Sequence, residues 1–286
     1  MSAPTRPAPI RTRPAEAPVA AVPELAEARA TTRRVARTFA IACRMLPRDI
    51  RDDVYLLYLV FRTLDDLVDE RRPEAAERVE AVAAWAEGRP GARTREVVTL
   101  EALASRHPVP PQAMADFCAG MRQDIERATF ATEAEVDLYC YRVAGTVGLM
   151  MAAILGMRDR DRAEPAAAAL GMAMQRTNIL RDIDEDAAAG SSYVARETIG
   201  RLGPPEPGLR EALVRDQIAR AEALFEQGID GIPELRRGRR AIAAAAAMYR
   251  EILREIERGG YGARPGRAVV PGRRKLAVGL RAALSA

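Results

Sequence analysis

The stretch that decides the fold of this 286-residue chain is Gln175-Arg-Thr-Asn-Ile-Leu-Arg-Asp-Ile-Asp-Glu-Asp186, with the apolar residues before it. At about 100° per residue, a helix places five polar or small positions within about 80° of one another. These positions are Gly171, Gln175, Asn178, Asp182 and Asp186. The other faces of this helix are mostly apolar. A surface helix shows the reverse pattern, with one apolar face and polar residues on the remaining faces. We therefore predict a buried helix with one polar stripe facing a cavity.

A second polar stripe lies earlier in the chain, within Tyr58-Leu-Val-Phe-Arg-Thr-Leu-Asp-Asp-Leu-Val-Asp69. Helical spacing puts the following side chains on or beside one face: Tyr58, Arg62, Asp65, Asp66 and Asp69. Acids this close on an apolar wall repel one another and lose hydration, which a bound cation would offset. A solvated acidic helix end is the alternative for this segment alone, but two such stripes in one chain favour a cation site.

Carboxylates are the main titratable groups, because the chain has 40 Asp and Glu residues but one histidine and three cysteines. This composition argues against zinc sites, di-iron bundles and a Ser-His-Asp triad, since we expect His107 to lie in a surface turn. Two facing carboxylate clusters at an apolar helical cavity suit Mg²⁺, which prefers oxygen ligands and shares them with phosphates. The arrangement favours departure of a diphosphate, with apolar walls excluding water from the resulting carbocation.

A third element is the segment Tyr139-Cys-Tyr-Arg-Val-Ala-Gly-Thr-Val-Gly148. Its glycines are best explained by close packing of a neighbouring helix. Tyr139 is different, because a phenol that points into an apolar cavity could transfer a proton or stabilise a cation.

The organisation of the chain is all-α, since Ala, Leu, Glu and Arg dominate from residue 24 onward without β-branched alternation. Residues 1–23 contain six prolines and no periodicity, so we predict a disordered arm there and one all-α domain over 24–286. Helices are expected over 24–45, 49–71, 74–87, 94–105, 111–128, 132–156, 165–188, 208–228, 236–258 and 272–284. The segment 189–207 is expected to be a long loop.

The net charge of +4 is unevenly distributed. Residues 258–286 carry six arginines and Lys275 without any acid, so the remaining body is net acidic. The basic end could contact acidic lipid or nucleic acid, or its arginines could simply be solvated. No secretory signal is visible and cysteines are few, so we expect a cytoplasmic protein. Peripheral membrane contact through the C-terminal segment is an additional hypothesis, and no nucleic-acid partner is expected.

In order and spacing, these elements resemble the squalene/phytoene synthase family, the head-to-head type of trans-isoprenyl diphosphate synthase, from about Ala30 to Lys275. Residues 65–69 and 175–186 are similar to its two aspartate-rich motifs, and 139–148 to its tyrosine segment. The resemblance implies a single-domain isoprenoid synthase fold with a central apolar cavity. It also implies Mg²⁺-dependent head-to-head condensation of two prenyl diphosphates, farnesyl or geranylgeranyl, with loss of diphosphate.

The resemblance further implies roles for individual residues. Metal and diphosphate would be bound by Asp65, Asp66, Asp69, Asn178, Asp182 and Asp186. Substrate would also contact Phe39, Arg62, Gln175, Asn178, Arg181 and Tyr193. Tyr58 and Tyr139 would lie near the reacting carbons.

One segment departs from the family pattern Gly-Arg-x-Tyr-Leu-Pro-x-Glu, because it reads Gly190-Ser-Ser-Tyr-Val-Ala-Arg-Glu197 here. Ser191 stands where an arginine would contact diphosphate, a contact worth ~1.5–3 kcal/mol, and Ala195 replaces the proline. Arg196 could compensate from the same loop. The departure leaves open a class I terpene cyclase that acts on one prenyl diphosphate on the same fold.

A non-enzymatic helical scaffold with a basic tail is a third hypothesis, which would leave the two aspartate stripes unexplained. No Gly-x-Gly-x-x-Gly segment follows a strand, so no Rossmann site is expected, but this does not decide whether NADPH is used. The oligomeric state is left open.

Overall fold

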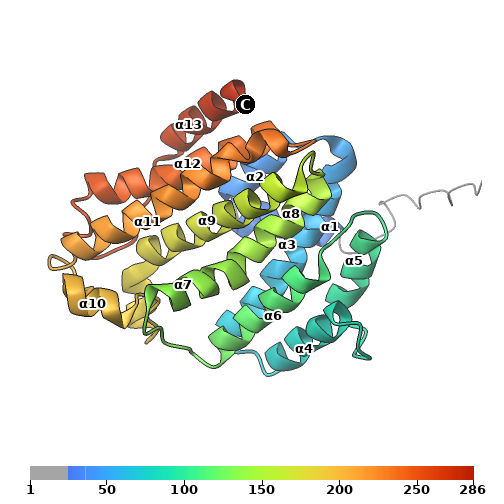
Figure 1. The fold of residues 1–286 in the computed structure, drawn as a ribbon, viewed down its shortest axis with the longest axis horizontal. Coiled ribbons are helices and arrows are strands. Elements are labelled where there is room, and N and C mark those ends of the chain that lie inside the picture. Colours follow the sequence, from blue (N-terminus) through green and yellow to red (C-terminus); the bar gives the residue numbers. More distant parts are fainter. Residues whose placement is uncertain (1–24, 36) are drawn as a thin grey trace, which may run out of the picture.

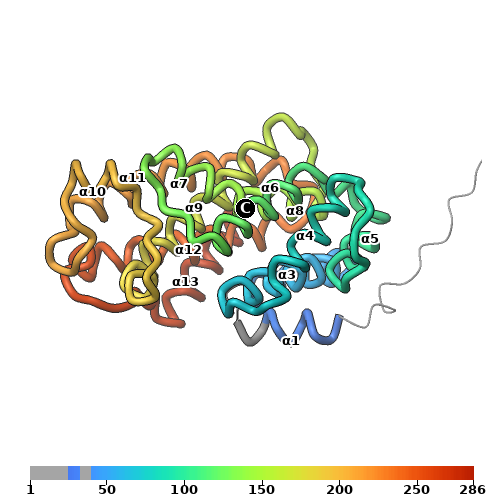
Figure 2. The backbone as a smooth tube through the Cα atoms, turned by 90° about the horizontal axis from the view of Figure 1, so that it is seen from below, coloured from blue at the N-terminus to red at the C-terminus, as the bar shows by residue number. Residues whose placement is uncertain are grey.

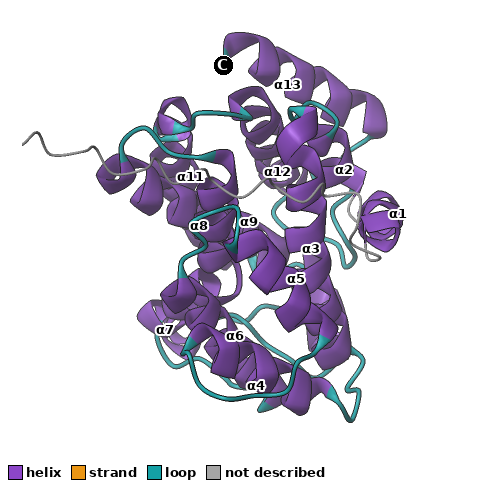
Figure 3. Ribbon diagram, turned by 90° about the vertical axis from the view of Figure 1, so that its right-hand side faces the viewer, coloured by secondary structure: helices purple, strands orange, loops and turns teal. Residues whose placement is uncertain are grey.

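The computed structural model describes the backbone of residues 25–35 and 37–286, and the side chains of these residues except 33–39. Every regular element in these ranges is helical, as Figure 3 shows, which confirms the all-α class. The α-helices are α1 (Leu25–Val35), α2 (Arg37–Cys43), α3 (Arg48–Asp69), α4 (Ala75–Ala86), α5 (Arg95–Ala104), α6 (Pro111–Ile125), α7 (Glu133–Cys140), α8 (Thr146–Leu155), α9 (Arg160–Ala188), α10 (Arg196–Leu202), α11 (Glu211–Asp230), α12 (Arg239–Arg258) and α13 (Gly272–Ser285). A π-helical turn, η2 (Tyr141–Gly145), joins α7 to α8, and a 3₁₀ turn, η3 (Ile232–Glu234), follows α11.

The helices are stacked around α9, the longest of them (Figure 1). From one side of the molecule to the other, the views pass from α13 through α12 and α9 to α6 and α4 (Figures 1 and 3). Helices α10 and α5 lie at opposite ends of the long axis (Figure 2). Helix α9 packs against α11, α8, η2 and α12, so the 175–186 stripe lies at the centre of the fold.

Local sequence signals explain where several helices begin. Thr94 caps α5 by accepting a hydrogen bond from the Val97 amide, and Thr132 caps α7 through the Glu135 amide. Asp159 accepts from two amides of the first turn of α9. Side-chain oxygens at these positions satisfy amides that have no partner inside the helix.

The helix predicted over 24–45 is covered by α1 and α2, and residue 36 between them lies outside the described backbone. Two elements differ from the sequence prediction. Helix α9 begins at Arg160 rather than at Pro165 because Asp159 caps it there. The predicted long loop 189–207 contains the short helix α10. Buried Thr198 of α10 donates a hydrogen bond to Glu133, and this tertiary contact stabilises the helix. The glycines and prolines on either side of α10 favour a loop, which is why the sequence did not predict a helix there.

Two glycines allow the helices around the centre to touch backbone to backbone. A β-carbon on Gly148 of α8 would lie 2.1 Å from the carbonyl oxygen of Ala167 on α9. A β-carbon on Gly171 of α9 would lie 2.1 Å from the carbonyl oxygen of Ala144. Only glycine permits this approach, which agrees with close helix packing as the role of the glycines in 139–148.

The apolar helical stretch Glu133–Leu155 has a length and composition that would suffice to cross a membrane. Within the protein, 50% of its most apolar window is buried, and Val143, Val147 and Met151 of this stretch line the central cavity. A helix that is buried in a protein core can have the same length and composition as a membrane-spanning helix. Packing inside the protein therefore accounts for the apolar character of this stretch.

Candidate functional site

A cavity of about 490 Å³ lies among α3, α6, α7–α8, α9, α11 and α12. Its wall is largely apolar and includes Phe61, Phe117, Met121, Met151 and Leu170. Seven of the residues predicted from the sequence line it: Tyr58, Arg62, Asp65, Tyr139, Gln175, Asn178 and Arg181. The cavity therefore combines an apolar chamber with a polar region built from both predicted stripes.

The α3 stripe is organised around Arg62. Its guanidinium pairs with Asp65 at 2.8 Å and also with Asp66. Asp65 keeps 42% of its side-chain surface accessible because it faces the cavity, yet it lies deep within the fold. Burial first, and then the charge of Asp69, raise the pKa of Asp65 to about 7. Arg62 lowers this pKa but does not outweigh them.

The α9 stripe is organised in a similar way around two arginines. Arg181 holds Asp182 with hydrogen bonds of 2.8 and 2.5 Å, and Arg267 reaches the same carboxylate at 3.0 Å. Both arginines line the cavity, so Asp182 lies next to it. Burial, together with the charges of Asp182 and Glu185, raises the pKa of Asp186 to about 6.

The carboxylates of the two stripes act on one another across the site. The charge of Asp69, at the end of α3, contributes to the raised pKa of Asp186 on α9. It also contributes to the raised pKa of Asp65 and of Asp124, a residue of α6. Carboxyls from three helices therefore share one region of negative potential. Within the described residues, no three acidic side chains already converge closely enough to chelate a metal ion.

Asp124 is a lining residue that the sequence prediction missed. Burial raises its pKa to about 6, and the charges of Asp69 and Asp186 act in the same direction. Tyr139 donates a hydrogen bond to its carboxylate at 3.0 Å, and Tyr193 donates another at 3.3 Å. The signal was present, because Phe117, Met121 and Asp124 share one helix face, with an acid ending an apolar stripe.

Tyr139 is buried and belongs to an aromatic cluster as well as to the cavity. Its ring stacks on Tyr193 with centroids 5.2 Å apart and contacts Phe130 at 5.1 Å. Burial and the neighbouring Asp124 carboxylate raise the pKa of Tyr139 well above its usual value. The phenol is therefore a neutral hydrogen-bond donor aimed at Asp124.

Two further lining residues were not assigned roles from the sequence, Tyr249 and Arg267. Tyr249 shares a face of α12 with lining residues Ile242 and Ala245, so helical periodicity could have found it. Arg267 lies in the irregular segment after α12, where no periodicity exists to reveal its direction.

The loop that departs from the family pattern lies beside the second stripe. Ser191, Tyr193 and Asp186 line a separate hollow of about 130 Å³. Arg196 does not line this hollow, and its side chain donates a hydrogen bond to Thr129 at 3.3 Å. Arg267 reaches two carboxylates of α9, Asp182 and Glu185.

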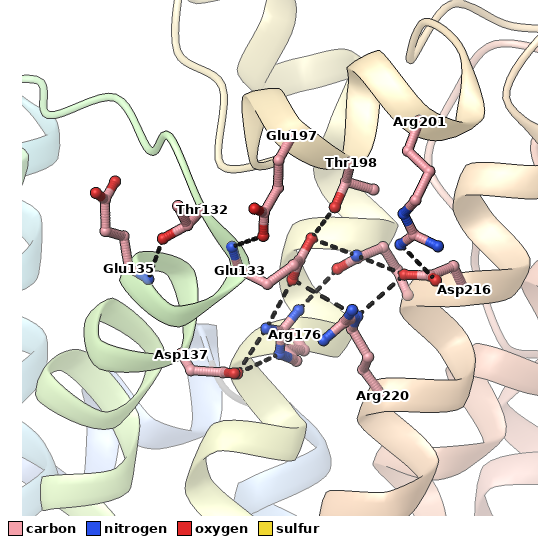
Figure 4. Close-up of polar contacts among 11 residues, drawn as sticks. Thr132, Glu133, Glu135, Asp137, Arg176, Glu197, Thr198, Arg201, Asp216 and Arg220 are labelled. Atoms are coloured by element: carbon pink, nitrogen blue, oxygen red, sulfur yellow. Dashed lines mark hydrogen bonds and ion pairs between the residues drawn. The ribbon is translucent and has the colours of Figure 1, made fainter.

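A buried polar network fixes α9 against α7, α10 and α11 (Figure 4). The guanidinium of Arg176, which is 2% exposed, pairs with Glu133 at 3.0 Å and with Asp137 at 2.6 Å, and it donates to Gln217 at 2.7 Å. Burial alone would raise the pKa of Glu133, but the hydrogen bond from Thr198 and the contact with Arg176 lower it overall. The network joins the helix that carries Tyr139 to the helix that carries Gln175 and Asn178.

The oxygen donors of the site fit a hard divalent cation such as Mg²⁺. The side-chain oxygen of Asn178 is buried without a hydrogen-bond partner among the described residues, although its residue lines the cavity. Burial first, and then repulsion between the carboxylates, raises the pKa values of Asp65, Asp124 and Asp186, and a bound cation would offset both effects. Carboxylate and amide oxygens are ligands that Mg²⁺ accepts.

Three predictions remain to be placed. The side chain of Phe39 lies outside the described residues, as does the arm over 1–23. The turn expected at His107 is present at residues 105–107, but the ring is not at the surface, because it is 10% exposed and lies 2.6 Å from the carboxylate of buried Asp53. Asp53 and His107 do not line the cavity.

Comparisons with known proteins find similar sequences along most of the chain. The sequence profile of the family described as squalene/phytoene synthase matches residues 32–274. The chain is 35% identical to a 15-cis-phytoene synthase from Synechocystis sp., over 92% of this chain and 86% of that protein. It is 36% identical to a phytoene synthase from Thermus thermophilus, over 78% of this chain and 80% of that protein. It spans 62% of the length of the chloroplastic phytoene synthase 3 of Zea mays, at 34% identity.

Solved structures give the same result. A dehydrosqualene synthase superposes with a TM-score of 0.82 at 26% identity, covering 92% of this chain and 95% of that chain. A squalene synthase from Alicyclobacillus acidocaldarius superposes with a TM-score of 0.71 at 26% identity, covering 85% and 98%. These matches confirm the resemblance inferred from the three motifs and the predicted fold with a central cavity.

Proposed function

Because this chain belongs to the squalene/phytoene synthase family of prenyltransferases, we propose that it joins two prenyl diphosphates head to head, with loss of diphosphate and dependence on Mg²⁺. The main support for the proposal is that carboxylates from α3, α6 and α9 lie near one another beside one apolar cavity. The relatives named phytoene synthases favour a phytoene-like product from two geranylgeranyl groups over a squalene-like product from two farnesyl groups.

Six side chains are proposed to hold the metal ions together with diphosphate oxygens: Asp65, Asp66, Asp69, Asn178, Asp182 and Asp186. The buried oxygen of Asn178 that has no partner and the raised pKa values around it support this assignment. When bound, Mg²⁺ supplies neutralising charge to the diphosphate leaving group. Asp124 lies within the same field of negative charge and is proposed to assist.

Arginines are proposed to complete the recognition of the diphosphate groups. Arg62 and Arg181 line the cavity beside the two aspartate stripes, and Arg267 adds a third cation there. Each carries a guanidinium whose planar fork matches phosphate oxygens, and each already faces carboxylates that metal ions would engage. Gln175 and Tyr193 are proposed to contact substrate in the same region.

The apolar chamber and its tyrosines are proposed to control the fate of the reacting carbons. Phe61, Phe117 and Met151 exclude water from the chamber, so a carbocation would be protected from quenching. Tyr58 and Tyr139 line this chamber. The hydrogen bond from Tyr139 to Asp124 gives a path for a proton to move away from the reacting region.

A test of the carboxylate assignment is the variant Asp65→Asn/Asp182→Asn, assayed for diphosphate release from prenyl diphosphate with Mg²⁺. We expect release to be lost while thermal unfolding stays close to that of the parent chain. The matched control is Asp230→Asn, an exposed acid at the end of α11, which should release diphosphate normally. Unchanged release by the double variant would overturn the assignment and revive the non-enzymatic scaffold.

A second candidate activity on the same fold is cyclisation of a single prenyl diphosphate. Ser191 beside Asp186 favours it, because the second diphosphate would lack one cationic contact from this loop. Arg267 argues against it, since this side chain brings a cation to the same carboxylates. The number of carbons in the product separates the two activities. Reduction with NADPH is not part of the proposal.

A further inference from the structure

The C-terminal helix α13 exposes its large apolar side chains and buries its small ones. Leu276, Leu280 and Leu284 follow one another at four-residue spacing and are 55%, 62% and 76% exposed. Gly279 and Ala283 face the protein instead and are buried. A helix that served only to cover the protein would turn its leucines inward, so this outward stripe indicates contact with something outside the chain.

Cations surround the leucine stripe, and no acid lies within it or near it in the sequence. Helix α13 carries Arg273, Arg274, Lys275 and Arg281, and residues 258–286 contain no Asp or Glu. Arg274 pairs with Glu255 of α12 at 2.8 Å. Arg273 and Arg281 form no ion pair with any residue that the structure describes, so their charge is available outward. Val269, just before the helix, is 68% exposed as well.

The position of α13 leaves this face open. The helix lies on the outside of α12 and forms one edge of the molecule (Figures 1 and 3). It rests on α12 through Gly279, whose β-carbon position is 3.2 Å from the Met248 side chain. Helix α12 also lines the cavity, through Ile242 and Ala245. A single helix therefore separates the leucine stripe from the catalytic chamber.

We propose that α13 docks this protein onto an anionic lipid bilayer, with the leucines in the acyl boundary and the arginines at the headgroups. Apolar burial and attraction of cations to anionic lipid act together in amphipathic helices of this composition. A second copy of the chain is a poorer occupant, because a two-fold contact through this face would bring two sets of cations together without any acid. The proposal does not depend on which prenyl substrate the cavity takes.

Cosedimentation of the full chain with lipid vesicles tests the proposal. We expect binding to vesicles of phosphatidylcholine mixed with phosphatidylglycerol, weaker binding to phosphatidylcholine alone, and a decrease as salt rises. The variant Leu276→Ser/Leu280→Ser/Leu284→Ser should bind the anionic vesicles ~10-fold more weakly or worse. The variant Arg273→Ser/Arg281→Ser should lose the preference for anionic over neutral vesicles.

The matched control is Leu209→Ser/Val98→Ser, which replaces large apolar residues exposed elsewhere on the protein and should bind like the parent chain. All variants should keep the parent's thermal unfolding temperature and rate of diphosphate release in detergent-free buffer. Three results would overturn the proposal. These are no binding of the parent chain to anionic vesicles, equal binding by the leucine variant, and a concentration-dependent dimer that the leucine substitutions abolish without any vesicle binding.

Discussion

The phenol of Tyr139 on α7 donates a hydrogen bond to the carboxylate of Asp124 on α6, with 3.0 Å between the two oxygens. Both residues line the cavity, and the stacked ring of Tyr193 also directs its hydroxyl to Asp124. The contact couples an aromatic wall to the carboxylates of the two aspartate stripes. Neither aspartate stripe predicts this contact from its own sequence, because Asp124 lies outside both.

Replacing Tyr139 with phenylalanine tests the importance of this hydrogen bond. The Tyr139→Phe ring can still stack on Tyr193, so we expect the fold to persist while kcat for diphosphate release falls ~100-fold. Steady-state kinetics with prenyl diphosphate and Mg²⁺ measure the effect. Tyr141→Phe is the control, because its hydroxyl bonds Asp116 and it does not line the cavity. Equal losses in the two variants would show that Tyr139 has no special role.

Arg267 is predicted to supply a diphosphate contact that Ser191 cannot. Loss of a charge-assisted contact is worth ~1.5–3 kcal/mol, so Arg267→Gln should raise KM for the prenyl diphosphate ~10- to 100-fold. Arg196→Gln is the control, since this side chain bonds Thr129 and should change KM little. A normal KM in Arg267→Gln would remove Arg267 from the binding site.

The buried Glu133 predicts an acid-sensitive contribution to stability. Its pKa is lower in the folded protein than in the unfolded chain, so the folded state binds fewer protons over that interval. The stabilising effect is therefore fully present above the ordinary glutamate pKa of about 4.3 and is lost as the pH falls through the folded-state pKa. Glu133→Gln should lower the free energy of unfolding by ~3 kcal/mol at neutral pH, because buried Arg176 loses a partner.

Urea unfolding at several pH values measures this contribution. The difference between Glu133→Gln and the parent chain should shrink as the solution becomes acidic, because the parent loses the same carboxylate. Glu77→Gln, at an exposed site of α4, should match the parent at every pH. A constant difference between Glu133→Gln and the parent would show that the charge of Glu133 is not what stabilises the network.

The contact between α8 and α9 predicts opposite effects for two glycine-to-alanine substitutions. Gly148→Ala would force a β-carbon against the Ala167 backbone, so we expect it to destabilise the protein by ~1–3 kcal/mol or more. Gly200 in α10 has no heavy atom within 4 Å of its β-carbon position apart from its chain neighbours and the backbone of its own helix, and Gly200→Ala should be neutral or stabilising by up to ~1 kcal/mol. Thermal unfolding of both variants measures the difference, and equal stability would contradict the close approach.

Helical periodicity was sufficient to predict much of the fold and site. The segments 175–186 and 58–69 each have a polar stripe on a mostly apolar helix, and this pattern predicts that both stripes face inward. In the structure, Asp69 and Asp186 lie close enough for their charges to interact. The same reasoning applied to 117–124 would have found Asp124. Because amphipathic spacing fixes which face a residue occupies, stripes of this kind can be read without coordinates.

Contacts between distant segments could not be predicted in this way. The helix α10 depends on the bond between Thr198 and Glu133, which lie 65 residues apart. The direction of Arg267 depends on an irregular segment that folds back to Asp182. The prolines after His107 predict a surface turn, and the turn forms, but pairing with Asp53 leaves the ring only 10% exposed. In each case a tertiary partner decides the structure, and local sequence carries no signal for that partner.

The most direct test of the central claim is mass spectrometry of the products that the purified protein forms with Mg²⁺. Farnesyl and geranylgeranyl diphosphate are supplied separately, each with and without NADPH. The two aspartate stripes beside one chamber predict a hydrocarbon or cyclopropyl diphosphate with twice the carbon count of the substrate, formed without NADPH. A product that keeps the carbon count of a single substrate would contradict head-to-head condensation and establish cyclisation instead.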